Sequence, residues 1–181
     1  YQSWSQKQAK TETIIGLFYV SEYGYSDRLA QSIGHGIQKT GVGVEMLDLA
    51  STDLQEIQEL AGRAAGFIIG MPPSHNTAAQ AAISSLLAVV KSKQVIGLYE
   101  SYGGDDEPID TLRRKFLEHG VREGFEAIRI KEEPQNDVFR AADEAGHEMG
   151  QLLVRERNIK HLKSIDADLE KALGRISNGL Y

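Results

Sequence analysis

From residue 13 onward the sequence alternates between short apolar runs and longer segments in which apolar residues recur every three or four positions. Runs such as IIGLFYV and GFIIG are almost continuously apolar, which is typical of strands covered on both faces. The striped segments between them predict amphipathic helices that pack on a sheet. The expected strands are Thr13–Val20, Val42–Leu47, Ala65–Gly70, Gln94–Tyr99 and Phe125–Ile130.

Local signals predict where some of the helices begin and end. Pro108 stands in the first turn of the fourth helix, and Gly120 follows that helix as a stop. Asp137 is placed to cap the last helix. The apolar stripes are Leu29, Ile33 and Ile37; Leu54, Ile57, Leu60 and Ala61; Ile83, Leu86, Leu87 and Val90; Ile109, Leu112 and Phe116; and Val138, Ala142, Ala145, Met149 and Leu152.

Strands that alternate with helices predict an α/β fold with a parallel sheet and helices on both faces. Right-handed crossovers leave few topologies, and for five strands the usual order is 2-1-3-4-5. Ligands of such folds bind beyond the carboxyl ends of the strands, where the strand order reverses. We therefore expect the ligand near the loops that follow the first, third and fourth strands.

Composition narrows the function classes. The net charge of −6 disfavours nucleic acid or an anionic membrane as the main partner. The absence of cysteine excludes disulfides, thiolate catalysis, iron–sulfur clusters and cysteine-ligated zinc, and it fits a cytoplasmic location. No segment reaches the roughly 18 consecutive apolar residues that a membrane helix needs.

The loop after the first strand has the residues of an anion site. Its sequence is Ser21-Glu22-Tyr23-Gly24-Tyr25-Ser26, and it leads directly into a helix. Backbone N–H groups around a glycine, at a helix amino end, form a cradle for phosphate. The serine hydroxyls can donate further hydrogen bonds. The Glu22 carboxylate lies in the same loop, so an anion site requires its side chain to point away from the anion. The alternative is that Ser26 only caps the helix and Gly24 only turns the chain.

The loop after the third strand, Gly70 to Thr77, is stiffened by two prolines. Backbone amides and the Asn76 side chain could bind the polar edge of a flat heterocycle, with His75 against its face. The alternative is a proline-rich turn in which Asn76 or Thr77 caps the next helix.

The loop after the fourth strand runs Glu100-Ser101-Tyr102-Gly103-Gly104-Asp105-Asp106-Glu107. The glycine pair lets backbone N–H groups face a ligand, and Tyr102 offers a plane for stacking. The acidic residues complement the amino end of the next helix. No histidine is close in sequence, so we expect no metal site.

These three loops resemble those of flavodoxin, and more narrowly those of the flavodoxin-like domain of flavodiiron proteins (diflavin flavoproteins) of oxygenic phototrophs. The segments that carry the resemblance are VSEYGYSDRLAQ, IIGMPPSHNTAAQ and YESYGGDDEPIDTLRRKF. The resemblance implies a flavodoxin-like domain at residues 12–157. It also implies that residues 1–11 are a linker from a preceding metallo-β-lactamase-like di-iron domain. Residues 158–181 are then a linker and the start of a flavin reductase-like domain.

The resemblance implies an FMN domain that relays electrons from an NAD(P)H-fed reductase domain to a di-iron site, which reduces oxygen or, in other branches, nitric oxide. It further implies a homo- or hetero-oligomer in the full-length protein. No acid–base or nucleophilic constellation is evident, so we expect no catalytic residue in this fragment and no complete turnover by it. The implied FMN-binding residues are Ser21, Glu22, Tyr23, Gly24, Tyr25, Ser26, Pro73, Ser74, His75, Asn76, Thr77, Ser101, Tyr102, Gly103 and Gly104.

The sequence departs from its relatives in the third loop. Many relatives have a tryptophan where Gly104 stands, and Asp105 and Asp106 add carboxylates near the flavin ring. We expect weaker FMN binding and a lower potential for the anionic reduced flavin. The alternative is a degenerate flavodoxin fold that serves as a scaffold or dimerisation module without flavin.

Two other classes with a related topology fit the sequence poorly. A phosphorylatable receiver domain needs an acidic pair after the first strand and an aspartate after the third, where this chain has Ser21-Glu22 and Met71-Pro72. A nicotinamide-binding Rossmann domain needs G-x-G-x-x-G after the first strand, which is absent.

Overall fold

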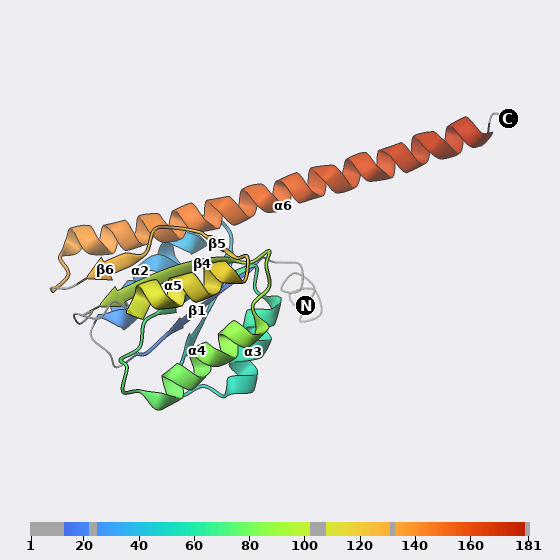
Figure 1. Ribbon diagram of the computed structural model, residues 1–181. Coiled ribbons are helices and arrows are strands. Elements are labelled where there is room, and N and C mark those ends of the chain that lie inside the picture. Colours follow the sequence, from blue (N-terminus) through green and yellow to red (C-terminus); the bar gives the residue numbers. More distant parts are fainter. Residues whose placement is uncertain (1–12, 22–24, 102–107, 131–132, 180–181) are drawn as a thin grey trace, which may run out of the picture.

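A computed structural model describes residues 13–21, 25–101, 108–130 and 133–179 of the chain (Figure 1). It shows one parallel sheet in the order β2-β1-β3-β4-β5, with β6 also paired to β4. The predicted α/β class and strand order are therefore confirmed. The strands are β1 (Ile14–Tyr19), β2 (Gly43–Asp48), β3 (Gly66–Gly70), β4 (Val95–Ser101), β5 (Arg122–Glu123) and β6 (Ile128–Ile130).

Helices cover both faces of the sheet. The apolar side chains of α2 and α6 pack on one face, and those of α3, α4 and α5 pack on the other (Figure 1). All five residues of β3 and all seven of β4 are buried, which explains why those runs are nearly continuous in apolar character. The helices are α2 (Ser26–Gln38), α3 (Leu54–Arg63), α4 (Thr77–Val89), α5 (Pro108–Glu118) and α6 (Asn136–Gly179).

The local helix signals have mixed outcomes. The α5 helix begins at Pro108 as expected, and Gly120 follows it with φ +80°, a conformation that glycine adopts without strain. The α6 helix begins one residue before Asp137, whose carboxylate accepts a hydrogen bond from the adjacent N–H of Val138. The prediction of Asp137 as N-cap is therefore wrong by a residue or two, a common error at helix ends.

The predicted fifth strand is shorter than expected and divided in two. Between the pairs Ile96–Glu123 and Tyr99–Ile128, β4 has two residues and the opposing segment has four. The ring of Phe125 fills the space beside Gly97, where a Cβ atom would lie 2.2 Å from the ring. The side chain of Phe125 is thereby buried in the core on the α2 and α6 face, and the strand is interrupted at that point.

The helices α2 and α6 approach each other closely because glycines face the contact. A Cβ atom on Gly146 would lie 2.0 Å from the carbonyl oxygen of Ile33, and one on Gly36 would lie 1.8 Å from that of Asp143. One turn further along α6, Gly150 lies against the side chain of Thr40. The backbone contacts at Gly36 and Gly146 and the Thr40 side chain at Gly150 leave no room for a Cβ atom, so α6 is fixed on the domain by its first half.

The second half of α6 differs from the sequence prediction. Residues 158–181 are expected to be a linker and the start of another domain, whereas α6 continues without a break to Gly179 and extends beyond the sheet (Figure 1). No proline lies between residues 136 and 179, and no glycine lies between Gly150 and Gly174, so nothing in the sequence stops the helix where a linker is expected. The assignment of residues 158–181 to another domain remains a prediction.

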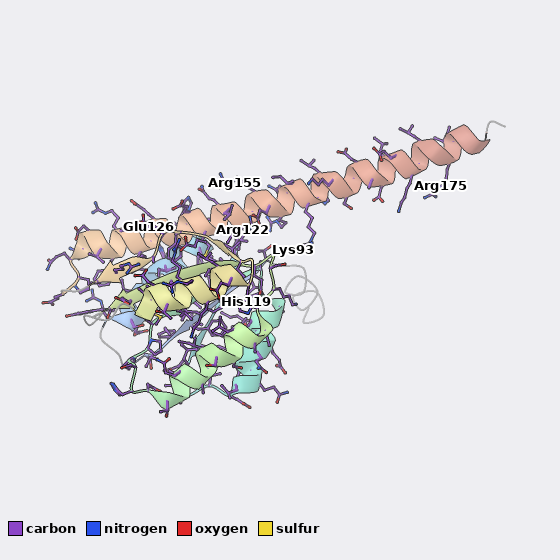
Figure 2. All side chains as sticks on the ribbon, in the orientation of Figure 1. Lys93, His119, Arg122, Glu126, Arg155 and Arg175 are labelled. Carbon is purple, nitrogen blue, oxygen red and sulfur yellow. The ribbon has the colours of Figure 1, made fainter. Side chains whose placement is uncertain are left out.

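The extension of α6 presents apolar side chains to solvent, and Figure 2 shows its side chains as far as Arg175 projecting with no other element beside them. Six large hydrophobic residues there are 48–63% exposed. At about 100° per residue they lie on the side of α6 opposite Met149 and Leu153, which pack on the sheet. No helix in the described part of the chain is both long and apolar enough to cross a bilayer. The six residues are Ile159, Leu162, Ile165, Leu169, Leu173 and Ile176.

Candidate functional site

The carboxyl ends of β1, β3 and β4 lie side by side at one edge of the sheet. The ladders pair Phe18 with Ile69 and Gly70 with Tyr99, and the N–H of Met71 donates to the carbonyl of Tyr99 over 2.9 Å just past the strand end. The three loops in which the sequence predicts a ligand therefore start at the same edge. Parallel pairing of buried strands is what brings them together.

The amino end of α2 lies at this edge, and among the described residues no side chain caps it. Tyr25 occupies the N-cap position with φ −98° and ψ 15° and makes no side-chain cap hydrogen bond. By contrast, Asp53 caps α3 and Asn76 caps α4 through bonds to backbone N–H groups. The first-turn N–H groups of α2 need an acceptor from outside the helix, and an anion is the acceptor that a helix amino end favours.

The first and third loops are joined by a hydrogen bond. The backbone N–H of Tyr25 donates to the Oγ of Ser101 over 3.2 Å. Ser101 is the last residue of β4 and is only 4% exposed. Its hydroxyl thus positions the start of α2, which is a different contact from the one with the flavin ring that the sequence predicts for it.

Ser26 is buried and faces the protein interior. Its Oγ lies 3.2 Å from the phenol oxygen of Tyr99, and the Tyr99 hydroxyl donates to the Ser26 carbonyl over 3.0 Å. The Tyr99 ring passes over Gly70, where a Cβ atom would lie 2.4 Å from the ring. Burial raises the pKa of Tyr99 well above its usual range, so the phenol stays protonated. A contact from Ser26 to a phosphate would therefore come from its backbone N–H.

Ser21 directs its donors at a carboxylate. Its Oγ donates to Oδ2 of Asp48, and its backbone N–H donates to the same oxygen over 3.3 Å. Asp48 ends β2 and pairs with Tyr19 across the ladder, which places it next to the first loop. Burial raises the pKa of Tyr19, and the nearby carboxylates of Asp27 and Asp48 raise it further. Two carboxylates, those of Asp27 and Asp48, therefore lie near the end of β1.

The second loop combines exposed side chains with a helix cap. Ser74, His75 and Thr77 are exposed, while Pro73 and Asn76 are partly buried. The Oδ1 of Asn76 accepts the N–H of Ala79 over 3.0 Å. The structure thus confirms the prediction that Asn76 caps the next helix. It does not decide whether capping is the only role of this residue. The amide NH₂ group of Asn76, and the exposed side chains beside it, are what the loop can offer to a ligand.

Part of the predicted site lies outside the described residues. This applies to Glu22, Tyr23 and Gly24 in the first loop and to Tyr102, Gly103 and Gly104 in the third. Their roles remain predictions from the sequence. The flanking residues Ser21, Tyr25 and Ser101 lie at the same edge of the sheet as the second loop.

Two residues that the sequence does not single out turn out to organise this edge. The sequence predicts Tyr99 only as the end of a buried strand, yet its hydroxyl donates to the carbonyl of the first residue of α2. Asp48 lies at the end of β2, outside the point where the strand order reverses, so the topology rule does not mark it. One signal was available, since the carboxyl end of β2 lies beside that of β1 in the predicted order, and an aspartate there can reach the first loop.

The arrangement fits a flat, phosphorylated heterocycle. The amino end of α2, which no side chain of the described residues caps, offers backbone donors for a phosphate group. The second loop follows the neighbouring strand β3 and offers exposed polar groups. The hydroxyls of Ser21 and Ser26 are already engaged within the protein, so backbone amides are left as the main donors.

Comparison with known proteins identifies the family. The sequence profile of the flavodoxin family matches residues 17–146. A putative diflavin flavoprotein A 2 from Nostoc sp. is 67% identical over all of this chain, which spans 31% of that protein. The chain thus spans about a third of the length of this curated relative.

Solved structures agree with this result. A crystal structure of a diflavin flavoprotein A3 from Nostoc sp. has 52% sequence identity and a TM-score of 0.77, and the match covers 83% of this chain and 99% of that one. A flavodiiron core from Synechocystis sp. has 35% identity and a TM-score of 0.76, and the match covers 86% of this chain and 40% of that one. The chain belongs to the flavodoxin family, as a flavodoxin-like domain of the kind that diflavin flavoproteins contain.

Proposed function

We propose that this domain binds FMN at the carboxyl edge of its sheet, with the phosphate group at the amino end of α2. The observation that carries this proposal is that, within the described part of the chain, no side chain caps α2, at the edge where Asn76 caps α4. A dianionic phosphate is stabilised by the positive end of the helix dipole and by first-turn N–H groups. The family to which the chain belongs supports flavin as the ligand.

Within this site, the backbone from Ser21 to Ser26 surrounds the phosphate, and two loops line the ring. Residues 73–77 lie on one side of the ring and residues 101–104 on the other. When bound, FMN supplies the electron transfer itself. The protein fixes its position: the bond from Tyr25 to Ser101 ties the phosphate loop to the third loop, and Asn76 anchors the second loop to α4.

In the longer protein, the domain passes electrons from an NAD(P)H-fed flavin reductase domain to a di-iron site that reduces oxygen. The support for this role is that its curated relatives are about three times as long, and that a flavodiiron core is among the similar structures. The other domains and the oligomer of the full-length protein then supply the remaining contacts around the flavin. Turnover belongs to that assembly.

A scaffold domain without flavin is the second candidate. It is favoured by one observation, that the hydroxyls of Ser21 and Ser26 are both committed to partners within the protein. A phosphate site of this kind has fewer donors than the sequence suggests.

A flavin titration separates the two candidates. We expect purified protein to bind FMN with a change in flavin absorbance and fluorescence, and to bind riboflavin more weakly because riboflavin lacks the phosphate group. In amide NMR spectra, FMN should shift the N–H signals of Ser26, Asp27 and Arg28, and the capped amide of Gln55 on α3 serves as the control. A protein that ignores both flavins at every concentration would contradict FMN binding and support the scaffold.

A further inference from the structure

Ser21 opens the phosphate loop, yet its donors point toward a side chain on another strand. Both its Oγ and its backbone N–H donate to Oδ2 of Asp48. The second carboxylate oxygen, Oδ1, accepts the N–H of Ala50 over 2.8 Å. Asp48 is thus held at both oxygens, in a fixed orientation beside the loop.

This contact has two consequences for an anion in the loop. A hydroxyl has one proton, so the Ser21 hydroxyl cannot donate to a phosphate while it donates to Asp48. The Asp48 carboxylate also places a negative charge near the phosphate group, which itself carries two negative charges. Both effects act against the phosphate, and neither acts on the uncharged part of a flavin.

We propose that Asp48 weakens the binding of the FMN phosphate group by occupying the donors of Ser21. Asp48 acts through Ser21 and is in this sense a positioning residue. The inference depends on the proposed FMN site and adds to it the residue that limits phosphate affinity. It is independent of the ring contacts, which lie in the second and third loops.

The variant Asp48→Asn tests this directly. Its single side-chain oxygen can keep the bond to Ala50, which leaves the NH₂ group facing Ser21. An NH₂ group donates to the serine oxygen and cannot accept the Ser21 backbone N–H, so both Ser21 donors become free to point at the phosphate. The negative charge is lost at the same time, with almost no change in side-chain shape.

We expect Asp48→Asn to lower the Kd for FMN by about fivefold, as the loss of one close charge repulsion predicts. Its Kd for riboflavin should stay at the wild-type value. The matched control is Asp53→Asn, which removes the same charge from the start of α3. Asp53 makes a cap bond to Gln55 that asparagine also makes, and no contact with Ser21 is present.

A double-mutant cycle tests the route through Ser21. The cycle compares the cost of Ser21→Ala in two backgrounds, and that cost should be smaller in the wild-type background, where the hydroxyl donates to Asp48. In the Asp48→Asn background, the same substitution should weaken FMN binding several-fold. This non-additivity is the result that a purely structural role of Asp48 would not produce.

Each outcome has a clear meaning. If wild-type protein binds FMN and Asp48→Asn binds it no more tightly, the inference is wrong and the FMN site stands. Equal tightening for riboflavin would also overturn the inference, because the effect would not involve the phosphate. If no variant binds either flavin, the proposed function fails, and the inference fails with it.

Discussion

The hydroxyl of Tyr99 donates a hydrogen bond to the backbone carbonyl of Ser26 over 3.0 Å inside the domain. Because the hydroxyl hydrogen of Tyr99 is used in the bond to the carbonyl, the Ser26 hydroxyl is the donor in its bond to the phenol oxygen. These two bonds connect the end of β4 with the first residue of α2, on the face of the sheet that α2 and α6 cover. Tyr99 therefore belongs to the hydrophobic core and also supports the candidate site.

Replacing Tyr99 by phenylalanine should destabilise the domain and weaken the site together. We expect the free energy of unfolding to fall by about 1–2 kcal/mol, since the Ser26 hydroxyl loses its partner in a buried place. FMN affinity should fall as well, because the amino end of α2 is less firmly held. Urea unfolding and a flavin titration measure the two effects.

The matched variant is Ser26→Ala. In this variant the Tyr99 hydroxyl still donates a hydrogen bond to the backbone carbonyl of residue 26. We therefore expect a smaller loss in the free energy of unfolding than for the phenylalanine variant of Tyr99. Equal losses for both variants would mean that the carbonyl bond contributes nothing.

The contact between α2 and α6 predicts a large effect at one glycine. In Gly146→Ala the new Cβ would lie 2.0 Å from the Ile33 carbonyl oxygen, which is backbone and cannot move without shifting a helix. We expect the free energy of unfolding to fall by about 3 kcal/mol, at the upper end of overpacking costs. Chemical denaturation of purified protein measures this.

Gly174 on the same helix is the control. No atom lies within 4 Å of where its Cβ would be, and the helix there is exposed. Gly174→Ala should leave the domain as stable as wild type and raise the helix content of the extension, since alanine favours a helix by about 1 kcal/mol over glycine. A Gly146→Ala protein as stable as Gly174→Ala would show that α6 does not pack as described.

The parts of the fold that the sequence predicts well are those governed by local pattern. The strands β1 to β4 agree with the predicted strands to within two residues. For β1, β3 and β4 the reason is burial on both faces, which leaves a continuous apolar signal. The interruption between β5 and β6 depends on Phe125 filling the space at Gly97, a contact between distant segments. Periodicity along one strand cannot reveal it.

The candidate site shows the same division. Strand order alone places the three loops at one edge, and capping preferences mark Asn76 correctly as a cap. The partners of the two serines were not predictable in this way. Ser26 meets Tyr99 across 73 positions of sequence, and Ser21 meets Asp48 across 27. The sequence shows that the loop contains hydroxyl groups, but their hydrogen-bond partners depend on the tertiary fold.

Stability in acid should depend on Asp143. Its carboxylate binds His35 on α2 at 2.5 Å and Lys39 at 2.6 Å. The hydrogen bond from His35, and then that from Lys39, lower the pKa of Asp143 below its ordinary value of 3.8. The folded protein therefore releases this proton more readily than the unfolded chain. The resulting stabilisation is present above about pH 4 and is lost as the pH falls through the lowered pKa.

The test compares wild type with Asp143→Asn in urea unfolding between about pH 2.5 and pH 6, a range that extends to both sides of the ordinary aspartate pKa. We expect the variant to be less stable at the upper end and the difference to shrink toward the lower end. Asp168→Asn, on the exposed extension of α6, should show no such trend. A gap between wild type and Asp143→Asn that stays constant with pH would rule out a role for this ionisation.

Asn76 allows its two roles to be separated, because aspartate and asparagine cap helices about equally well and alanine does not. Asn76→Ala should lower the free energy of unfolding by about 1 kcal/mol through loss of the bond to Ala79. Asn76→Asp should keep that stability. If the NH₂ group of Asn76 donates to the edge of the flavin ring, both variants should bind FMN more weakly, and the aspartate more so because it lacks a donor and repels the electron-rich ring. An aspartate variant with wild-type FMN affinity would show that Asn76 is a cap alone, and the ring contacts would then have to come from its exposed neighbours Ser74, His75 and Thr77.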